Sequence, residues 1–148
     1  MKQYSFSNIK ARPFPTINDI NNPWIFGKVK CVINVSEHIS NFEKEYAERG
    51  ISYFHFPLKE NVDDMGWENI LSAVKVLIEN VKNDIPTIVH CIGGNNRSRS
   101  VVEAAYFALN HEHLQDECKG FVNHLVCNAE NQFLPYTLEE IEQQLSAL

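Results

Sequence analysis

The sequence predicts an α/β domain with a central, mainly parallel sheet flanked by helices and with a helical C-terminal third. Short apolar segments of strand character alternate three times with helical segments between residues 29 and 113, and only helical patterns follow. Such alternation is typical of parallel βαβ units with right-handed crossovers and helices on both faces of the sheet. The 148 residues contain no repeat, low-complexity tract or Pro/Gly-rich linker. We therefore expect a single domain, residues 1–148.

The first strand–helix–strand unit is expected between residues 29 and 58. VKCVINV (29–35) alternates its side chains between two faces, which is the periodicity of a strand. NFEKEYAERG (41–50) reads as a short helix closed by Gly50. ISYFHFPL (51–58) returns as an aromatic and β-branched strand that ends near Pro57.

The second half of the pattern contains the clearest helix. Apolar residues recur at threes and fours over residues 67–81, which predicts an amphipathic helix lying against the sheet. PTIVHC (86–91) is apolar without alternation, as expected of a central strand covered on both faces. A helix is predicted over 97–113, and two more should follow. The second of them opens at Thr137, with Glu140 completing a capping box.

Composition and charge narrow the function classes. A formal net charge of -6 gives no general attraction to polyanions, so neither a nucleic acid nor a membrane is an expected partner. The N-terminus lacks the apolar run of a signal peptide, and no stretch approaches the roughly 18 apolar residues of a membrane span. A cytoplasmic location is expected. The four cysteines show no Cys-x-x-Cys spacing, which favours reduced thiols over a zinc site or disulfide framework.

HCIGGNNRSRS (90–100) forms the connection between the central strand and the helix that follows it. This is where ligands bind in open α/β sheets. The glycines and asparagines at 93–96 tolerate left-handed backbone conformations, so successive N–H groups can turn inward as an anion nest next to the helix N-terminus. Arg97 adds a planar donor fork that suits two oxygens of a phosphate or sulfate. The loop is therefore predicted to bind a tetrahedral oxyanion.

A cysteine within such a loop is expected to ionise. Thiols at helix N-termini or beside cations have lowered pKa values, which makes Cys91 a thiolate at neutral pH. A thiolate beneath a bound phosphate is placed for in-line attack on phosphorus. The product of that attack would be a phosphocysteine.

Residues 90–98 resemble the His-Cys-x-x-Gly-x-x-Arg-Ser/Thr signature of protein tyrosine phosphatases at every fixed position. The flanking VINVSE, YFHFPL and AAYFAL segments resemble the dual-specificity subgroup, so that roughly residues 29 to 125 are covered. The resemblance implies a dual-specificity phosphatase-like domain that hydrolyses phosphate monoesters. It implies neither metal nor cofactor.

The resemblance also implies roles for individual residues. Cys91 would be the nucleophile, Arg97 the phosphate clamp and Ser98 a hydrogen-bond donor to the leaving sulfur. His90 would help to hold the thiolate environment from behind. The residues expected to bind phosphate are Ile92, Gly93, Gly94, Asn95, Asn96 and Arg97.

The general acid is where the sequence departs from the family pattern. An Asp is expected about thirty residues before the cysteine, and alignment on the YFHFPL strand puts Glu60 there, 31 residues before Cys91. Asp63 and Asp64 follow closely. We rank Glu60 first, Asp63 second and Asp64 third, and we keep open that all three form only a solvated acidic loop.

Several neighbouring residues have structural interpretations. Ser100 and Glu103 read as a helix capping box, and Arg99 is expected to point outward from the first helical turn. The remaining cysteines are expected in the core, although one of them could trap an oxidised Cys91 as a disulfide. They are Cys31, Cys118 and Cys127.

The expected substrate is a phosphorylated protein or peptide. Phosphotyrosine is favoured over phosphoserine and phosphothreonine, which stay open as further substrates, because an aryl oxide leaves with less need of an acid. The loop carries no lysine, which argues against polyphosphorylated inositols, and the acidic charge argues against an RNA 5′-phosphatase. Two alternatives stay open. The loop could hold a phosphorylated partner without turnover, as in a pseudophosphatase, or the chain could be a rhodanese-like sulfurtransferase, which the Arg-Ser end fits poorly.

Overall fold

The computed structural model describes residues 3–59, 65–94, 96–114 and 124–148. Its strands form one parallel sheet in the order β1-β4-β2-β3. They are β1 (Ile9–Arg12), β2 (Cys31–Asn34), β3 (Ser52–His55) and β4 (Thr87–His90). The inner strands β2 and β4 are buried along their whole length. The predicted α/β architecture and the central place of the 86–91 segment are thus confirmed.

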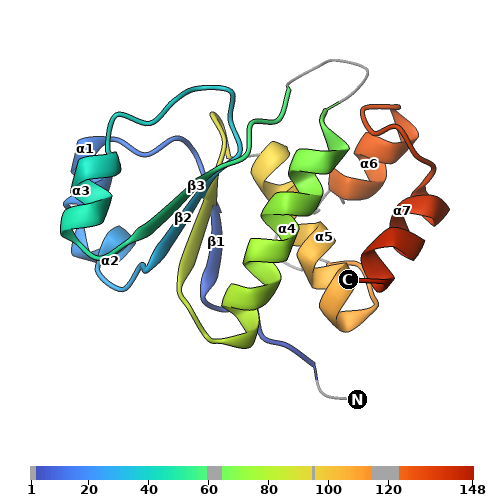
Figure 1. Ribbon diagram of the computed structural model, residues 1–148, viewed down its shortest axis with the longest axis horizontal. Helices are drawn as coiled ribbons and strands as arrows, with labels where there is room; N and C mark the ends of the chain where they lie inside the picture. The colour runs from blue at the N-terminus through green and yellow to red at the C-terminus, as the bar shows by residue number, and fades with distance from the viewer. Residues whose placement is uncertain (1–2, 60–64, 95, 115–123) are drawn as a thin grey trace.

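Helices cover both faces of the sheet, as Figure 1 shows. One side carries the short helices α1 (Ile17–Ile20), α2 (Pro23–Phe26) and α3 (Glu43–Glu48). The other carries α4 (Trp67–Lys82), α5 (Arg97–Asn110), α6 (His124–Glu130) and α7 (Leu138–Ser146). None of the described helices is both long and apolar enough to cross a bilayer.

The pleat of the sheet divides the apolar residues into two cores. Ile33 of β2 and Val89 of β4 face the larger core, which is built with α4, α5 and the C-terminal helices. Their neighbours Val32 and Ile88 face a smaller core that includes Phe26 of α2. Because side chains alternate along a strand, one apolar run serves both cores.

The predicted C-terminal helices are present, and α7 begins as expected. Thr137 accepts a hydrogen bond from the backbone N–H of Glu140, whose carboxylate accepts one from the N–H of Thr137. Trp67 of α4 donates its indole N–H to Gln144 of α7 over 2.8 Å. The C-terminal helix α7 is therefore hydrogen-bonded to α4, which covers the sheet.

The edge strand β1 and the two helices after it lie in a part of the chain for which the sequence predicted no element. β1 pairs with β4 in register, from Ile9 opposite Thr87 to Arg12 opposite His90. Thr16 caps α1, and Asn22 caps α2 with a proline in its first turn. These four-residue elements are too short to show a periodicity.

The capping box expected from Ser100 and Glu103 is wrong. α5 begins at Arg97, so Ser100 lies inside the helix and donates its hydroxyl to the carbonyl of Asn96 over 2.8 Å. The buried Glu103 instead accepts a 2.6 Å hydrogen bond from the backbone N–H of Leu125. Glu103 therefore caps the start of α6, because unpaired N–H groups at a helix start favour a carboxylate.

Glu103 holds its proton to an unusually high pH. Burial raises its pKa from 4.5 to about 7, although the N–H groups of Leu125 and His124 and the charge of Arg99 act in the opposite direction. One carboxylate oxygen has no hydrogen-bond partner among the described residues. The folded state thus retains a proton between pH 4.5 and 7 that the unfolded state has lost, and stability falls across that range as pH rises.

We expect Glu103→Gln to flatten this pH dependence. Gln resembles the neutral acid in shape and carries no charge to desolvate, so the variant should gain about 3 kcal/mol over wild type between pH 4.5 and pH 8. Denaturant unfolding of both proteins across this range measures the difference. Parallel stability profiles would contradict the raised pKa.

Candidate active site

The predicted phosphate loop lies at the carboxyl end of β4 and leads directly into α5. Backbone hydrogen bonds from two neighbouring segments hold the first residues of the loop. The N–H of Val35 donates to the carbonyl of His90 over 2.8 Å, and the N–H of Phe14 donates to the carbonyl of Ile92 over 2.9 Å. The loop is thus anchored to the segments that follow β1 and β2, at the edge where open α/β sheets bind ligands.

Gly94 has a conformation and a position that exclude a side chain. Its φ is +75°, and a Cβ atom would lie 2.6 Å from the backbone of both Arg12 and Pro13. The backbone N–H of Gly94 donates to the Cys91 sulfur over 3.2 Å. Because β1 runs directly beneath the loop, glycine is required for this N–H to face the thiol.

Cys91 is 2% exposed, and its sulfur is held by hydrogen bonds. Burial by itself raises the pKa of the thiol. The Ser98 hydroxyl, 3.4 Å from the sulfur, the N–H groups of Ser98 and Gly94 and the charge of Arg97 together outweigh burial and lower the pKa. The surroundings therefore favour a thiolate at the base of the loop.

Arg97 is buried and connects the loop to a second segment of the site. Its Nη1 donates to the carbonyl of Leu58 over 3.1 Å. Leu58 follows β3, and the N–H of the next residue, Lys59, donates to the carbonyl of Met65 over 3.0 Å. The candidate acids between these two residues, Glu60, Asp63 and Asp64, lie outside the described residues. Sequence reasoning missed Leu58, because a backbone carbonyl has no residue signature.

His90 lies beneath the loop as a neutral side chain. Burial lowers its pKa to about 4, and the nearby His55 acts in the same direction. Its Nδ1 is 3.3 Å from the carbonyl oxygen of Cys91, and its ring packs edge-on against Phe14 at 4.7 Å between centroids. His90 therefore acts on the loop through packing and its backbone contact, because it carries no positive charge at neutral pH.

Arg99 supports the loop from behind. It was expected to point outward, but it is half-buried and donates its Nε–H to the carbonyl of Gly94 over 3.2 Å. This bond fixes the carbonyl of Gly94, the residue whose N–H donates to the Cys91 sulfur. The outward prediction is thus wrong, and Arg99 belongs to the scaffold of the site.

The other predicted loop residues differ in their exposure to solvent. Ile92 and Gly93 are exposed and Asn96 is half-buried, while Asn95 lies outside the described residues.

Of the cysteines considered as disulfide partners of an oxidised Cys91, Cys118 also lies outside the described residues. Cys31 is buried but pairs in register with Thr87, four residues before Cys91, a separation of roughly 13 Å along the strand. That exceeds the reach of a disulfide, so Cys31 is not a direct trap for an oxidised Cys91.

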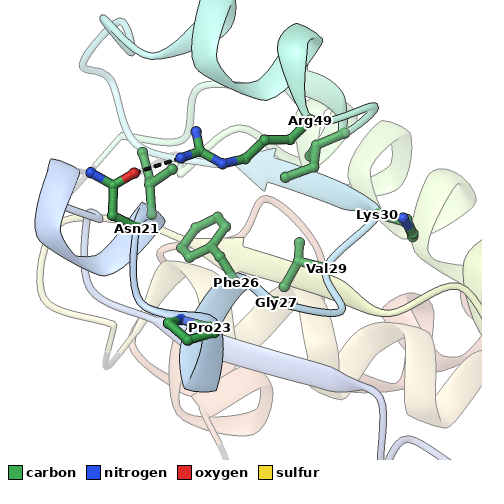
Figure 2. A pocket seen from close by; sticks show the side chains of 9 residues that line it. Asn21, Pro23, Phe26, Gly27, Val29, Lys30 and Arg49 are labelled. Atoms are coloured by element: carbon green, nitrogen blue, oxygen red, sulfur yellow. Dashed lines mark hydrogen bonds between the residues drawn. The ribbon is translucent and has the colours of Figure 1, made fainter.

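A hollow of about 310 Å³ lies at the opposite end of the sheet, between α2 and the end of α3. Figure 2 shows Arg49 reaching across it to bond the side chain of Asn21, above Phe26 and Pro23. Lys30, just before β2, stands at its rim. The guanidinium of Arg49 is thus already bonded within the protein, and the hollow lies at the end of the sheet away from Cys91. Among the residues that the structure describes, no three acidic, His or Cys side chains gather as a metal site.

Solved structures share this fold. PTPMT1, in a complex with PI(5)P, has a TM-score of 0.69 at 15% identity, with 99% of this chain and 98% of that chain covered. A putative phosphatase (DUF442) from Shewanella putrefaciens CN-32 has a TM-score of 0.65 at 14% identity, with 99% and 88% covered. The core catalytic domain of the PP-IP phosphatase SIW14 from S. cerevisiae has a TM-score of 0.59 at 13% identity, with 99% and 82% covered.

No protein-family model matches the sequence, and no curated protein matches it. The solved structures alone show that the chain has the phosphatase fold that its signature led us to expect.

We expect Gly94→Ala to destabilise the protein by about 3 kcal/mol, since it adds a backbone clash to the cost of a positive φ. Gly50→Ala is the matched control. Gly50 has a φ of +69° with nothing near its Cβ position, so its substitution should cost only about 1 kcal/mol. Denaturant unfolding compares the two variants, and equal losses would refute the close approach of β1.

We expect Ser98→Ala to raise the pKa of the Cys91 thiol, because it removes a hydrogen bond to the sulfur. The rate of alkylation of Cys91 against pH, read by mass spectrometry, reports the change. Ser72→Ala is the control, since this exposed serine bonds the carbonyl of Glu68 within α4 and lies outside the loop. A Ser98 variant with an unshifted profile would remove that hydroxyl from the thiolate's support.

Proposed function

We propose that the chain is a cysteine-dependent phosphatase that hydrolyses phosphate monoesters, with phosphotyrosine in proteins as its main substrate. The observation that carries the proposal is the buried Cys91 sulfur, which accepts a hydrogen bond from the Gly94 N–H while the Ser98 hydroxyl and Arg97 lie close by. A low-pKa thiol within an anion-binding loop suits nucleophilic attack on phosphorus. The fold shared with solved phosphatases supports the proposal.

The proposed reaction has two displacement steps. In the first, the Cys91 thiolate attacks phosphorus, an S–P bond forms, and the P–O bond to the substrate breaks while a carboxylic acid of the protein gives its proton to the leaving oxygen. In the second, water attacks phosphorus and gives a proton to the resulting carboxylate, and the S–P bond breaks, which returns the thiolate and releases inorganic phosphate. Loop N–H groups and Arg97 bind the non-bridging oxygens throughout, where charge is held in both transition states.

Ser98 and His90 have different parts in this scheme. The Ser98 hydroxyl lies 3.4 Å from the sulfur and donates to it when Cys91 is a thiolate, which stabilises the thiolate that must leave in the second step. His90 is a positioning residue, because it is neutral and touches the carbonyl of Cys91 rather than the sulfur.

We further propose that the general acid is Glu60, Asp63 or Asp64, in that order. The support is the position of the flanking residues, since Leu58 bonds Arg97 and the backbones of Lys59 and Met65 are bonded to each other. An acid supplied from between them would approach the phosphate that Arg97 holds.

Two features favour an aryl phosphate. No described loop residue between Cys91 and Arg97 is basic, so the loop offers no side-chain cation for further phosphates besides Arg97. Ile92, which is 41% exposed, offers an apolar contact to a ring. PTPMT1 was solved with PI(5)P and SIW14 is a PP-IP phosphatase, so phosphoinositides and inositol pyrophosphates belong among the compounds to be tested.

The test is hydrolysis of an aryl phosphate, a phosphotyrosine peptide, PI(5)P and an inositol pyrophosphate by wild type and variants. We expect Cys91→Ser to reduce turnover of the aryl phosphate by more than about a thousandfold. Arg97→Lys should reduce it by about a hundredfold, because a single ammonium does not replace the planar fork.

A wild type without turnover would refute the proposal. If inorganic phosphate then still raised the melting temperature, the loop would be a phosphate-binding module without catalysis. Faster hydrolysis of PI(5)P or of the pyrophosphate than of the peptide would keep the chemistry and replace the protein substrate.

A further inference from the structure

A groove of about 230 Å³ runs between β1, the start of β4 and helix α2, on the face of the sheet away from α4 and α5. Lys10 and Arg12 of β1 and Lys28 after α2 line it, together with the side chain of Trp24. The described residues that line the groove include no Asp or Glu. Three cations without a carboxylate among them favour an anion as the ligand.

Lys10, Arg12 and Lys28 have no counter-charge among the residues that the structure describes. None of them forms an ion pair or a side-chain hydrogen bond with any part of the chain that the structure describes. Cations held together without counter-charges repel one another, and a bound anion relieves that repulsion. The charge of the groove is thus available to a ligand.

The distribution of charge along the chain sets this region apart. Residues 1–30 hold five of the 13 Lys and Arg residues and only one of the 19 Asp and Glu residues. The first 30 residues therefore carry +4 and the other 118 carry -10, which together give the net -6. The first 30 residues thus attract anions, whereas the net charge of the other residues opposes anions outside the phosphate loop.

Trp24 is 95% exposed, which is unusual for the largest apolar side chain. The groove floor beside it is apolar, with Ile25 and Ile88. Exposed tryptophans are typical anchors of interaction surfaces, where the ring packs on a partner and the N–H finds an acceptor. The groove therefore combines cations with an apolar contact, which suits an acidic peptide better than a small inorganic anion.

The strand that supplies two of the cations leads to the phosphate loop. Arg12 pairs in register with His90, the backbone of Arg12 and Pro13 lies beneath Gly94, and the next residue, Phe14, bonds the carbonyl of Ile92. The groove itself lies beside Thr87 and Ile88, at the start of β4. The distance from there to Cys91 is roughly 13 Å, which an extended peptide covers in about four residues.

We propose that the groove formed by Lys10, Arg12, Lys28 and Trp24 binds an acidic segment of the phosphorylated protein substrate, about four residues from the phosphotyrosine. This inference rests on the proposed function. A flat anionic membrane is a poorer partner, because the net charge of -6 opposes the approach of an extended anionic surface. A short peptide meets only the local charge, since interactions are screened beyond roughly 8 Å in physiological salt.

Binding is tested first without catalysis. The probe is an unphosphorylated peptide rich in Asp and Glu, and the signal is the emission of Trp24, since Trp67 is buried and bonded to Gln144. We expect Lys10→Gln/Lys28→Gln to weaken binding about tenfold. The matched control Lys75→Gln/Lys82→Gln removes two exposed charges from α4 and should bind like wild type. No change of emission in wild type, or equal weakening in both variants, would overturn the proposal.

Selectivity is tested next with two phosphotyrosine peptides. One carries acidic residues beginning four positions from the phosphotyrosine, on either side, and the other carries Asn and Gln there. We expect wild type and the α4 control to prefer the acidic peptide about tenfold in kcat/KM, and the Lys10/Lys28 variant to lose that preference. All three should hydrolyse a small aryl phosphate equally.

The outcomes separate the two proposals. Turnover of the aryl phosphate without any preference between peptides overturns the groove and leaves the phosphatase intact. Failure to hydrolyse any substrate refutes the proposed phosphatase activity. In that case the emission of Trp24 alone tests whether the groove binds the acidic peptide. Binding to phosphatidylserine vesicles that depends on Lys10 and Lys28, in the absence of peptide binding, would replace the peptide by a membrane.

Discussion

A buried sulfur with a lowered pKa is the feature on which the geometry of this molecule depends. Burial of a charge is unfavourable unless hydrogen bonds replace the lost water, and Cys91 finds them in Ser98 and in the N–H groups of its own loop. Those N–H groups point inward only if the loop turns at Gly94 with a positive φ. The same turn brings Gly94 against β1. The environment of the Cys91 sulfur therefore requires a glycine at position 94 and a position of β1 directly beside the loop.

The C-terminal helices stabilise the loop from behind through buried polar side chains. Asn128 of α6 donates to the hydroxyl of Ser100 over 2.6 Å, and that hydroxyl donates to the carbonyl of Asn96 at the end of the loop. One turn further along α5, Glu103 caps the start of α6. Buried polar groups are stable only when they are paired, so these contacts admit few arrangements of α6 against α5. The helical layer thus positions the end of the loop as well as covering the core.

The sequence predicted what depends on local patterns and missed what depends on packing. Parallel strands, the amphipathic α4, the cap at Thr137 and the placing of Cys91 at a strand–helix turn follow from periodicity and residue type. β1 was missed because four residues show no period, and its support comes from pairing with β4. Ser100 and Glu103 fit a capping pattern, yet α5 starts earlier, because the loop delivers the chain to the helix at Arg97. The sequence spacing of Ser100 and Glu103 does not tell which helix the Glu103 carboxylate caps in the folded protein.

The net charge of the chain and the local charge of the groove lead to different expectations about ligands. A net charge of -6 predicts weak attraction to polyanions, and this holds for any ligand large enough to meet the whole surface. A ligand the size of a peptide side chain meets only the charges within a screening length of it. Within the groove those charges are Lys10, Arg12 and Lys28, without a carboxylate. The negative charge of the other residues therefore disfavours the binding of extended anions. A short acidic segment can still bind the positive groove beside the loop.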